Sequence, residues 1–273
     1  MVGMAAGPPD EVEQMLCDDL SELEKAAVVE AVQVAWRLLR RSSAAGGVDL
    51  RVAGEPEITR ELRNAVDALR IDPARPVGGF DESKFQHVPE SEVTPPYTLS
   101  SREQDQIKPD LVFRPVSIGR RLRRGLPSVV YGWYAECKII DRTKRHGHHK
   151  VNEYCAEGLI RFLRLEYAWA MPSGIMIAYV RDGSDVLSCL HRHLAEPENE
   201  KAYMVAQLPV SQARPPTDPL AASHPVHISV HGRSSDAKPP TPKGKGTPPA
   251  GSTNTKPVRA PEIRISHLWL QAV

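Results

Sequence analysis

A chain of 273 residues, 41% of them apolar, has room for one domain of ordinary size with extensions, or for two small domains. Four widely spaced cysteines exclude a disulfide framework and a cysteine-rich metal site, and no apolar stretch approaches membrane-spanning length. No charged-then-apolar signal segment opens the chain, so we expect a cytoplasmic protein without membrane contact.

The net charge of +1 conceals an uneven distribution along the chain. Residues 1–113 hold 12 basic and 21 acidic residues, whereas residues 114–150 hold 10 basic and 2 acidic residues. The remaining residues 151–273 are nearly neutral, with 13 basic and 11 acidic residues. A local excess of positive charge of this size predicts a docking surface for a polyanion near the middle of the chain.

The first predicted element is a long amphipathic helix over residues 10–41, within an N-terminal helical extension of residues 1–50. Its apolar residues recur with a roughly helical period, and Gly46-Gly47 end it. Because the apolar stripe is broad rather than a strict heptad, we expect the helix to pack on the chain's own core. A role in oligomerisation or in binding a partner remains open.

A second amphipathic helix is predicted over residues 55–71. Ile58, Leu62 and Val66 belong to its apolar stripe. At 100° per residue, Glu61 lies on the edge of that stripe and Glu57 lies further round. Both glutamates can equally be ordinary solvated charges on a surface helix.

Two short runs rich in β-branched and aromatic residues follow, and each carries charge. Asp110 starts the first run, while Glu136 and Lys138 lie inside the second. Because side chains alternate along a strand, Glu136 and Lys138 share one face with Tyr134, and the opposite face is almost wholly apolar. A strand with a core face and an acid–base pair on its other face indicates a functional site.

Basic residues gather in the two loops next to these strands. The first loop is bounded by Gly119 and Gly125, and the second spans residues 142–150. Both suit phosphate binding, although ordinary solvated loops remain an alternative. The candidate nucleic-acid-binding residues are Arg120, Arg121, Arg123, Arg124, Lys144, Arg145 and Lys150. A helix over residues 151–165 and a buried strand over residues 175–180 are predicted to follow.

The last part of the chain, residues 196–273, is predicted to form strands around an insert. Residues 234–260 are rich in Pro, Lys, Gly, Thr and Ser without apolar periodicity, so we expect a disordered loop. Residues 226–231 and 263–270 both have strand character, and we predict that they pair antiparallel across that insert. The alternative is a flexible extension beyond residue 215.

Pro109-Asp110, followed 26 residues after the aspartate by Glu136-Cys137-Lys138, resembles the signature of the PD-(D/E)xK nuclease superfamily. The resemblance covers residues 55–180. It implies an α/β fold: a restriction-endonuclease-like core over residues 51–195, with a mixed central sheet flanked by helices. The N-terminal helix and the C-terminal strands would be additions to that core.

The resemblance also implies a site. Asp110 and Glu136 would hold Mg²⁺ or Mn²⁺, and the backbone carbonyl of Cys137 would be a further ligand. Lys138 would orient or deprotonate the attacking water and stabilise charge on the phosphorus. A helix before the Pro-Asp strand often supplies another acidic group to the metal, and Glu61 is better placed for this than Glu57.

We therefore expect a metal-dependent endonuclease that acts on DNA, in bacterial anti-phage defence or DNA processing. Two other classes stay open. One is a catalytically inactive nucleic-acid-binding module on the same fold. The other is an interaction subunit of a larger complex, and self-association is compatible with each class. A salt-bridged strand face without catalytic meaning is the simplest alternative for the motif itself.

Overall fold

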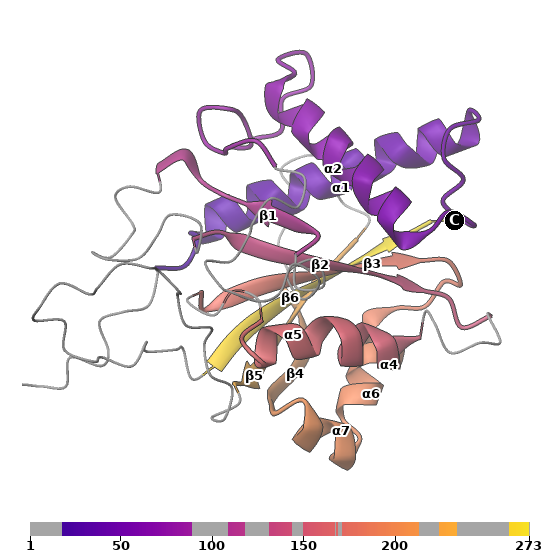
Figure 1. Cartoon of the computed structure of the whole chain (residues 1–273), viewed down its shortest axis with the longest axis vertical. Coiled ribbons are helices and arrows are strands. Elements are labelled where there is room, and N and C mark those ends of the chain that lie inside the picture. The colour runs from indigo at the N-terminus through magenta and orange to yellow at the C-terminus, as the bar shows by residue number, and fades with distance from the viewer. Residues whose placement is uncertain are drawn as a thin grey trace, which may run out of the picture.

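The computed structural model describes residues 18–88, 109–117, 131–143, 150–166, 168, 171–212, 224–233 and 262–272. These residues form an α/β structure in which a mixed six-stranded sheet lies between two layers of helices (Figure 1). Among the described helices, none combines the length and the apolar character needed to cross a membrane.

The sheet has the spatial order β1-β2-β3-β6-β5-β4. β1 is antiparallel to β2, the central strands β2, β3 and β6 are parallel, and β6, β5 and β4 are antiparallel neighbours. The strands span Leu111–Phe113 (β1), Trp133–Ile140 (β2), Ser173–Val180 (β3), Val205–Gln212 (β4), Val226–Gly232 (β5) and Glu262–Gln271 (β6).

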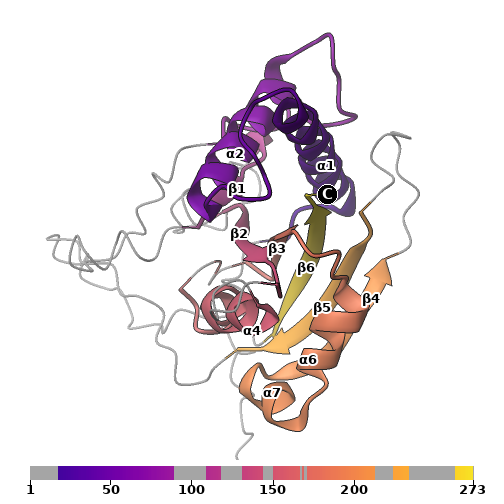
Figure 2. The same ribbon diagram turned by 90° about the vertical axis from the view of Figure 1, so that its right-hand side faces the viewer.

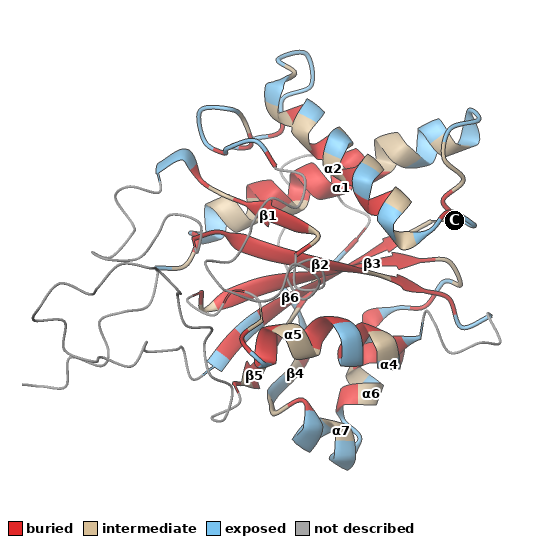
Figure 3. Ribbon diagram, viewed as in Figure 1, coloured by how far each residue is buried: buried red, intermediate tan, exposed pale blue. Residues whose placement is uncertain are grey.

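The centre of the sheet is covered on both faces. Every residue of β3 is buried, and its sequence is a continuous apolar run after Ser173-Gly174 (Figure 3). Parallel strands between two helical layers have this composition because neither face meets water. By contrast, most residues of β4 are exposed or only partly buried, as its place at the edge of the sheet requires.

One helical layer consists of α1 (Glu22–Ala44) and α2 (Glu55–Ile71). Ser21 caps the start of α1: its hydroxyl accepts from the Glu24 amide, while the Glu24 carboxylate accepts from the Ser21 amide. This capping box explains the sharp start of the helix. Residues 10–17 of the predicted helix lie outside the described residues, and α1 begins twelve residues later than predicted.

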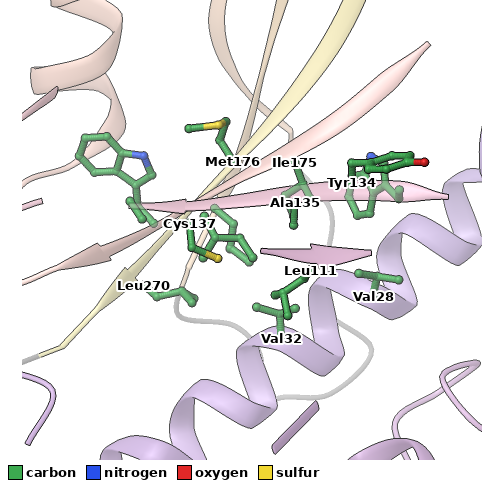
Figure 4. Close-up of a cluster of buried hydrophobic side chains, with 14 of the residues drawn as sticks. Val28, Val32, Leu111, Tyr134, Ala135, Cys137, Ile175, Met176 and Leu270 are labelled. Atoms are coloured by element: carbon green, nitrogen blue, oxygen red, sulfur yellow. The ribbon is translucent and has the colours of Figure 1, made fainter. Parts of the chain in front are cut away.

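α1 packs on the sheet, as its broad apolar stripe predicted. The Trp36 ring stacks on Tyr179 of β3 with 5.3 Å between centroids, and Trp36 Nε1 donates to the Gln271 carbonyl across 2.8 Å. Figure 4 shows Val28 and Val32 of the same helix beside Leu111 of β1. α1 therefore belongs to the central core.

The other layer starts with a continuous helical segment, as predicted for residues 151–165. It consists of α4 (Val151–Glu153), a π-helical stretch η4 (Tyr154–Leu159) and α5 (Ile160–Leu163). Next come η5 (Val186–His191), α6 (Arg192–Leu194) and α7 (Pro197–Ala202). Figure 2 shows α6 and α7 on the side of β4 and β5, away from α1 and α2.

The predicted antiparallel pairing of the C-terminal strands is confirmed. β5 pairs with β6 in a register that sets Val226 opposite Leu268 and His231 opposite Ile263. β6 also pairs with β3, so it occupies the middle of the sheet instead of extending its edge. The regions 51–195 and 196–273 consequently share one core. The predicted insert at 234–260 lies outside the described residues.

Candidate active site

The candidate site lies at the edge of β2 where β1 begins. β1 starts at Leu111 opposite Ala135, so the described part of the chain gives the second half of β2 no strand partner on that side. Asp110 extends the ladder by one step, because its amide donates to the Ala135 carbonyl across 3.1 Å. Its side chain extends it further: the Cys137 amide donates to Asp110 Oδ2 across 2.7 Å. Asp110 is thereby fixed against the motif strand.

Glu136 lies on the face of β2 that meets the helical segment α4–η4–α5. Its side chain is 2% exposed, and a Cβ built on Gly158 would come within 3.5 Å of Glu136 Cγ. The helix therefore packs directly against the Glu136 side chain at Gly158, and a side chain there would displace the flexible end of Met176. Glu136 Oε2 is buried and has no hydrogen-bond partner among the described residues, which is costly for a carboxylate oxygen. An oxygen in this condition is suited to bind a cation.

The Lys138 ammonium lies between three oxygen atoms. It donates to Glu136 Oε1 across 2.8 Å, to Glu55 Oε1 across 2.9 Å and to the Cys137 carbonyl across 2.9 Å. Since an ammonium has three N–H groups, these three bonds use its full donor capacity. Glu136 comes from β2 itself, whereas Glu55 comes from α2, so the ammonium joins the sheet to one helical layer.

Arg161 of α5 completes the charged cluster. Its Nη1 lies 3.4 Å from Glu136 Oε1, and its side chain is 27% exposed. Glu136 Oε1 thus lies close to the Lys138 and Arg161 cations, whereas Glu136 Oε2 accepts no hydrogen bond from either of them. With all groups ionised, three carboxylates meet two cations, so the cluster keeps one excess negative charge.

Burial dominates the electrostatics of the two motif carboxylates. Burial raises the pKa of Asp110, although the Lys138 charge and the Cys137 amide oppose the shift. Burial and the neighbouring Asp110 charge raise the pKa of Glu136 to about 8. Burial alone would lower the pKa of Lys138, but the carboxylates around it outweigh this effect and raise the pKa above its ordinary value. Lys138 is therefore a firmly charged ammonium.

The acidic residue that α2 brings to this cluster is Glu55, not Glu61. Glu61 pairs with its neighbour Arg60 across 3.2 Å, and neither Glu61 nor Glu57 is within hydrogen-bond reach of Lys138. The expectation of Glu61 ranked the glutamates only by their angle from the apolar stripe. Only the N-terminal end of α2 approaches the site, and Glu61 lies about 9 Å further along the helix axis. Pro56 in the first turn was the available signal, since it marks the helix start.

The predicted phosphate-binding residues are largely outside the described residues. This holds for Arg120, Arg121, Arg123, Arg124, Lys144 and Arg145. Lys150 is described: it is exposed and directly precedes α4.

The donor set has the chemistry of a site for a hard divalent cation. Asp110, Glu136 and the Cys137 carbonyl offer the oxygen ligands that Mg²⁺ prefers, and Glu136 Oε2 is a buried oxygen without a donor. In the described residues, no group of three or more His, Cys, Asp or Glu side chains is arranged to hold a metal by itself. A cation here would therefore use the backbone carbonyl and water in addition to two side chains.

Comparison with protein-family models, with curated proteins and with solved structures gives no match for this chain.

Proposed function

We propose that the chain is a metal-dependent endonuclease that hydrolyses phosphodiester bonds in DNA. The observation that carries the proposal is the meeting of the two halves of the motif at the open edge of β2. There Asp110 is tied to the Cys137 amide, and Glu136 is tied to the Lys138 ammonium two residues further on. Those are the residues that the PD-(D/E)xK resemblance assigns to catalysis.

The order of elements supports the same proposal. A helix (α2) precedes β1 and β2, a helical segment follows them, and β3 comes next. β2 is antiparallel to β1 and parallel to β3 within a mixed sheet between two helical layers. This succession of helix, two strands, helix and strand is the one that a restriction-endonuclease-like core requires. Phe85 adds an antiparallel bridge to Pro115, next to β1.

Mg²⁺ or Mn²⁺ is the cofactor that this reaction needs. Asp110, Glu136 and the Cys137 carbonyl would hold it. When bound, such an ion lowers the pKa of a water molecule and neutralises charge on the phosphate. The buried, unpaired Glu136 Oε2 favours a cation over an anion at this position.

Lys138 supplies the second part of the chemistry. Its ammonium bonds Glu136 and is held charged by the surrounding carboxylates, so it would stabilise the negative charge that develops on the phosphate oxygens. Because all three of its N–H groups are engaged, we assign it an electrostatic and positioning role rather than that of a general base. An arginine would keep the charge but could not fit three acceptors around one nitrogen.

A titration of Mg²⁺ and Mn²⁺ against cleavage of plasmid and single-stranded DNA tests the proposal. We expect cleavage by the wild-type chain in both metals and at least about 100-fold less by the Asp110→Asn variant, which keeps the shape of the side chain. DNA binding without cleavage by the wild-type chain would favour an inactive nucleic-acid-binding module. Neither binding nor cleavage would favour an interaction subunit.

A further inference from the structure

Lys138 owes its position to two residues from different layers of the fold. Glu136 precedes it by two positions on the same strand, so strand geometry alone brings their side chains together. Glu55 is 83 residues away in the sequence and lies in the first turn of α2. Its carboxylate meets the Lys138 ammonium at 2.9 Å. Glu55 is therefore the tertiary contact of this lysine.

The place of Glu55 on its helix is also well defined. Gly54 is the N-cap of α2, Glu55 is the first helical residue and Pro56 follows. A carboxylate in the first turn is stabilised by the positive end of the helix dipole, and Pro56 restricts the backbone at this point. The side chain is partly buried, and the Ile58 side chain three residues later anchors the turn in the core. Glu55 is thus held on the helix before it meets Lys138.

The same geometry separates Glu55 from the ligand set described above. Its contact is with the ammonium, while Asp110 bonds the Cys137 amide and Glu136 keeps a free oxygen. Without Glu55, one N–H of Lys138 would lose its acceptor, and the flexible lysine would be free to turn away from the site. A lysine that has four rotatable bonds holds a catalytic position only when such contacts restrain it.

We propose that Glu55 is a positioning residue that holds Lys138 in the active site, and that it acts through the lysine rather than through the metal. The inference deepens the proposed function, on which its catalytic meaning rests. The contact between Glu55 and Lys138 can be tested without any nuclease activity.

The first experiment measures the reactivity of Lys138 towards reductive dimethylation, site by site, by mass spectrometry. The Lys138 side chain is 12% exposed and fully bonded, so we expect slow labelling in the wild-type chain. Glu55→Ala should label about tenfold faster, as expected from loss of one charge-assisted hydrogen bond. Glu55→Gln keeps the shape and an acceptor oxygen and should label at an intermediate rate. The exposed Lys84 is the internal reference.

Glu61→Ala is the matched control, because it removes the same charge from the same helix without touching Lys138. It should leave labelling of Lys138 at the wild-type rate. Equal rates in the wild-type chain and in both Glu55 variants would overturn the proposed contact. Should Glu55→Ala fail to fold, the isosteric Glu55→Gln still decides the matter by the same comparison.

The second experiment separates positioning from metal binding, using Mn²⁺ affinity followed by electron paramagnetic resonance. We expect Glu55→Gln to change the Mn²⁺ Kd by less than about twofold while kcat for cleavage falls about 10- to 100-fold. Asp110→Asn should weaken Mn²⁺ binding by about tenfold or more. A loss of Mn²⁺ affinity in Glu55→Gln as large as in Asp110→Asn would make Glu55 a metal ligand and overturn the assignment. An unchanged kcat would overturn it as well.

If the wild-type chain binds no Mn²⁺ and cleaves no DNA, the proposed function fails, while the labelling experiment still reports on Glu55 and Lys138.

Discussion

The amide of Cys137 donates to Oδ2 of Asp110 across 2.7 Å, so that a side chain takes the place of a strand neighbour at the open edge of β2. This single bond joins the two halves of the motif, which lie 27 residues apart in the sequence. It also satisfies a backbone N–H that would otherwise be left in a buried position. The residue proposed to bind the metal therefore has a structural role too.

The two roles of Asp110 can be separated by substitution. Asp110→Asn keeps an acceptor for the Cys137 amide and should stay folded with cleavage reduced at least about 100-fold. Asp110→Ala should lose the same activity and also about 1–3 kcal/mol of stability, because the buried amide is left without a partner. Urea denaturation checks the difference. Equal stability of the two variants would show that the bond to Cys137 contributes nothing.

The motif carboxylate and lysine on β2 give a second activity test. Glu136→Gln and Lys138→Met should each abolish cleavage in a folded chain, as judged by plasmid cleavage and circular dichroism. Lys138→Met also removes the ammonium that competes for Glu136 Oε1, so Mn²⁺ binding should persist in it. Cleavage at the wild-type rate in either variant would remove that residue from the proposed site.

Salt dependence tests DNA as the partner. The excess of basic residues over residues 114–150 predicts affinity that falls steeply with salt. Replacing Arg120, Arg121, Arg123 and Arg124 together by serine should flatten the slope of log affinity against log salt by about 0.9 for each lost phosphate contact. Fluorescence anisotropy at several salt concentrations measures this slope. An unchanged slope would place these arginines away from the substrate.

The stacking of Trp36 on Tyr179 predicts that α1 is essential to the fold. Trp36→Ala should cost about 3–5 kcal/mol, because a fully buried ring and its bond to Gln271 are lost. Leu23, on the same helix but 76% exposed, is the matched control. Leu23→Ala should change stability by less than about 0.5 kcal/mol. Similar small losses in both variants would mean that α1 is only loosely attached.

A buried chain of hydrogen bonds runs from Tyr203, which follows α7, through β5 and β6 to Tyr154 of η4. His231 Nδ1 faces the Tyr203 carbonyl and must donate, so His231 Nε2 accepts from the Ser229 hydroxyl. That hydroxyl then accepts from His267 Nε2, and His267 Nδ1 accepts from the Tyr154 hydroxyl. In this arrangement Ser229 and the two histidines each donate one hydrogen bond and accept one, with both imidazole rings neutral.

Neutral buried histidines make stability depend on pH. Burial lowers the pKa of His231 to about 4, and it lowers the pKa of His267 well below its ordinary value of 6.5. Between about pH 6.5 and pH 4 these two histidines become protonated in the unfolded chain but stay neutral in the native chain. The free energy of unfolding therefore falls as the pH falls. Urea midpoints at pH 7.5 and pH 5 should show this loss.

His231→Gln tests the assignment. The substitution should lower the free energy of unfolding at pH 7.5. It should also reduce the further loss of stability between pH 7.5 and pH 5, because the variant lacks a histidine that is protonated only in the unfolded chain. The matched control is His87→Gln, which replaces an exposed histidine. It should not show a reduced loss between the two pH values. An acid response in His231→Gln as large as in the wild-type chain would exclude His231 as a source of the pH dependence.

The position of β6 predicts the outcome of two truncations. Ending the chain after residue 260 removes the strand between β3 and β5, so both would lose a hydrogen-bonded neighbour and the chain should not unfold cooperatively. Deleting residues 235–257 shortens the segment between β5 and β6, which the sequence predicts to be a loop. Because loop closure depends weakly on length, Tm should change by no more than a few degrees. A cooperative transition in the first truncation would contradict the central place of β6.

The sequence by itself determined the local features of this protein. Alternation along residues 133–140 set Glu136 and Lys138 on one face and Cys137 on the other, since side-chain direction in a strand depends only on the residue count. The helical period likewise predicted which side of residues 151–163 would face the core, with Tyr154 and Phe162 buried. The pairing of β5 with β6 followed from their apolar patterns.

Only the tertiary structure decided which distant residues meet. Glu55 rather than Glu61 reaches Lys138 because the N-terminal end of α2 lies at the site, and β6 takes its place between β3 and β5. Both outcomes arise from packing between elements far apart in the chain, and helical or strand periodicity contains no information about that packing. Local periodicity specifies the faces of each element, and long-range burial specifies which faces come together.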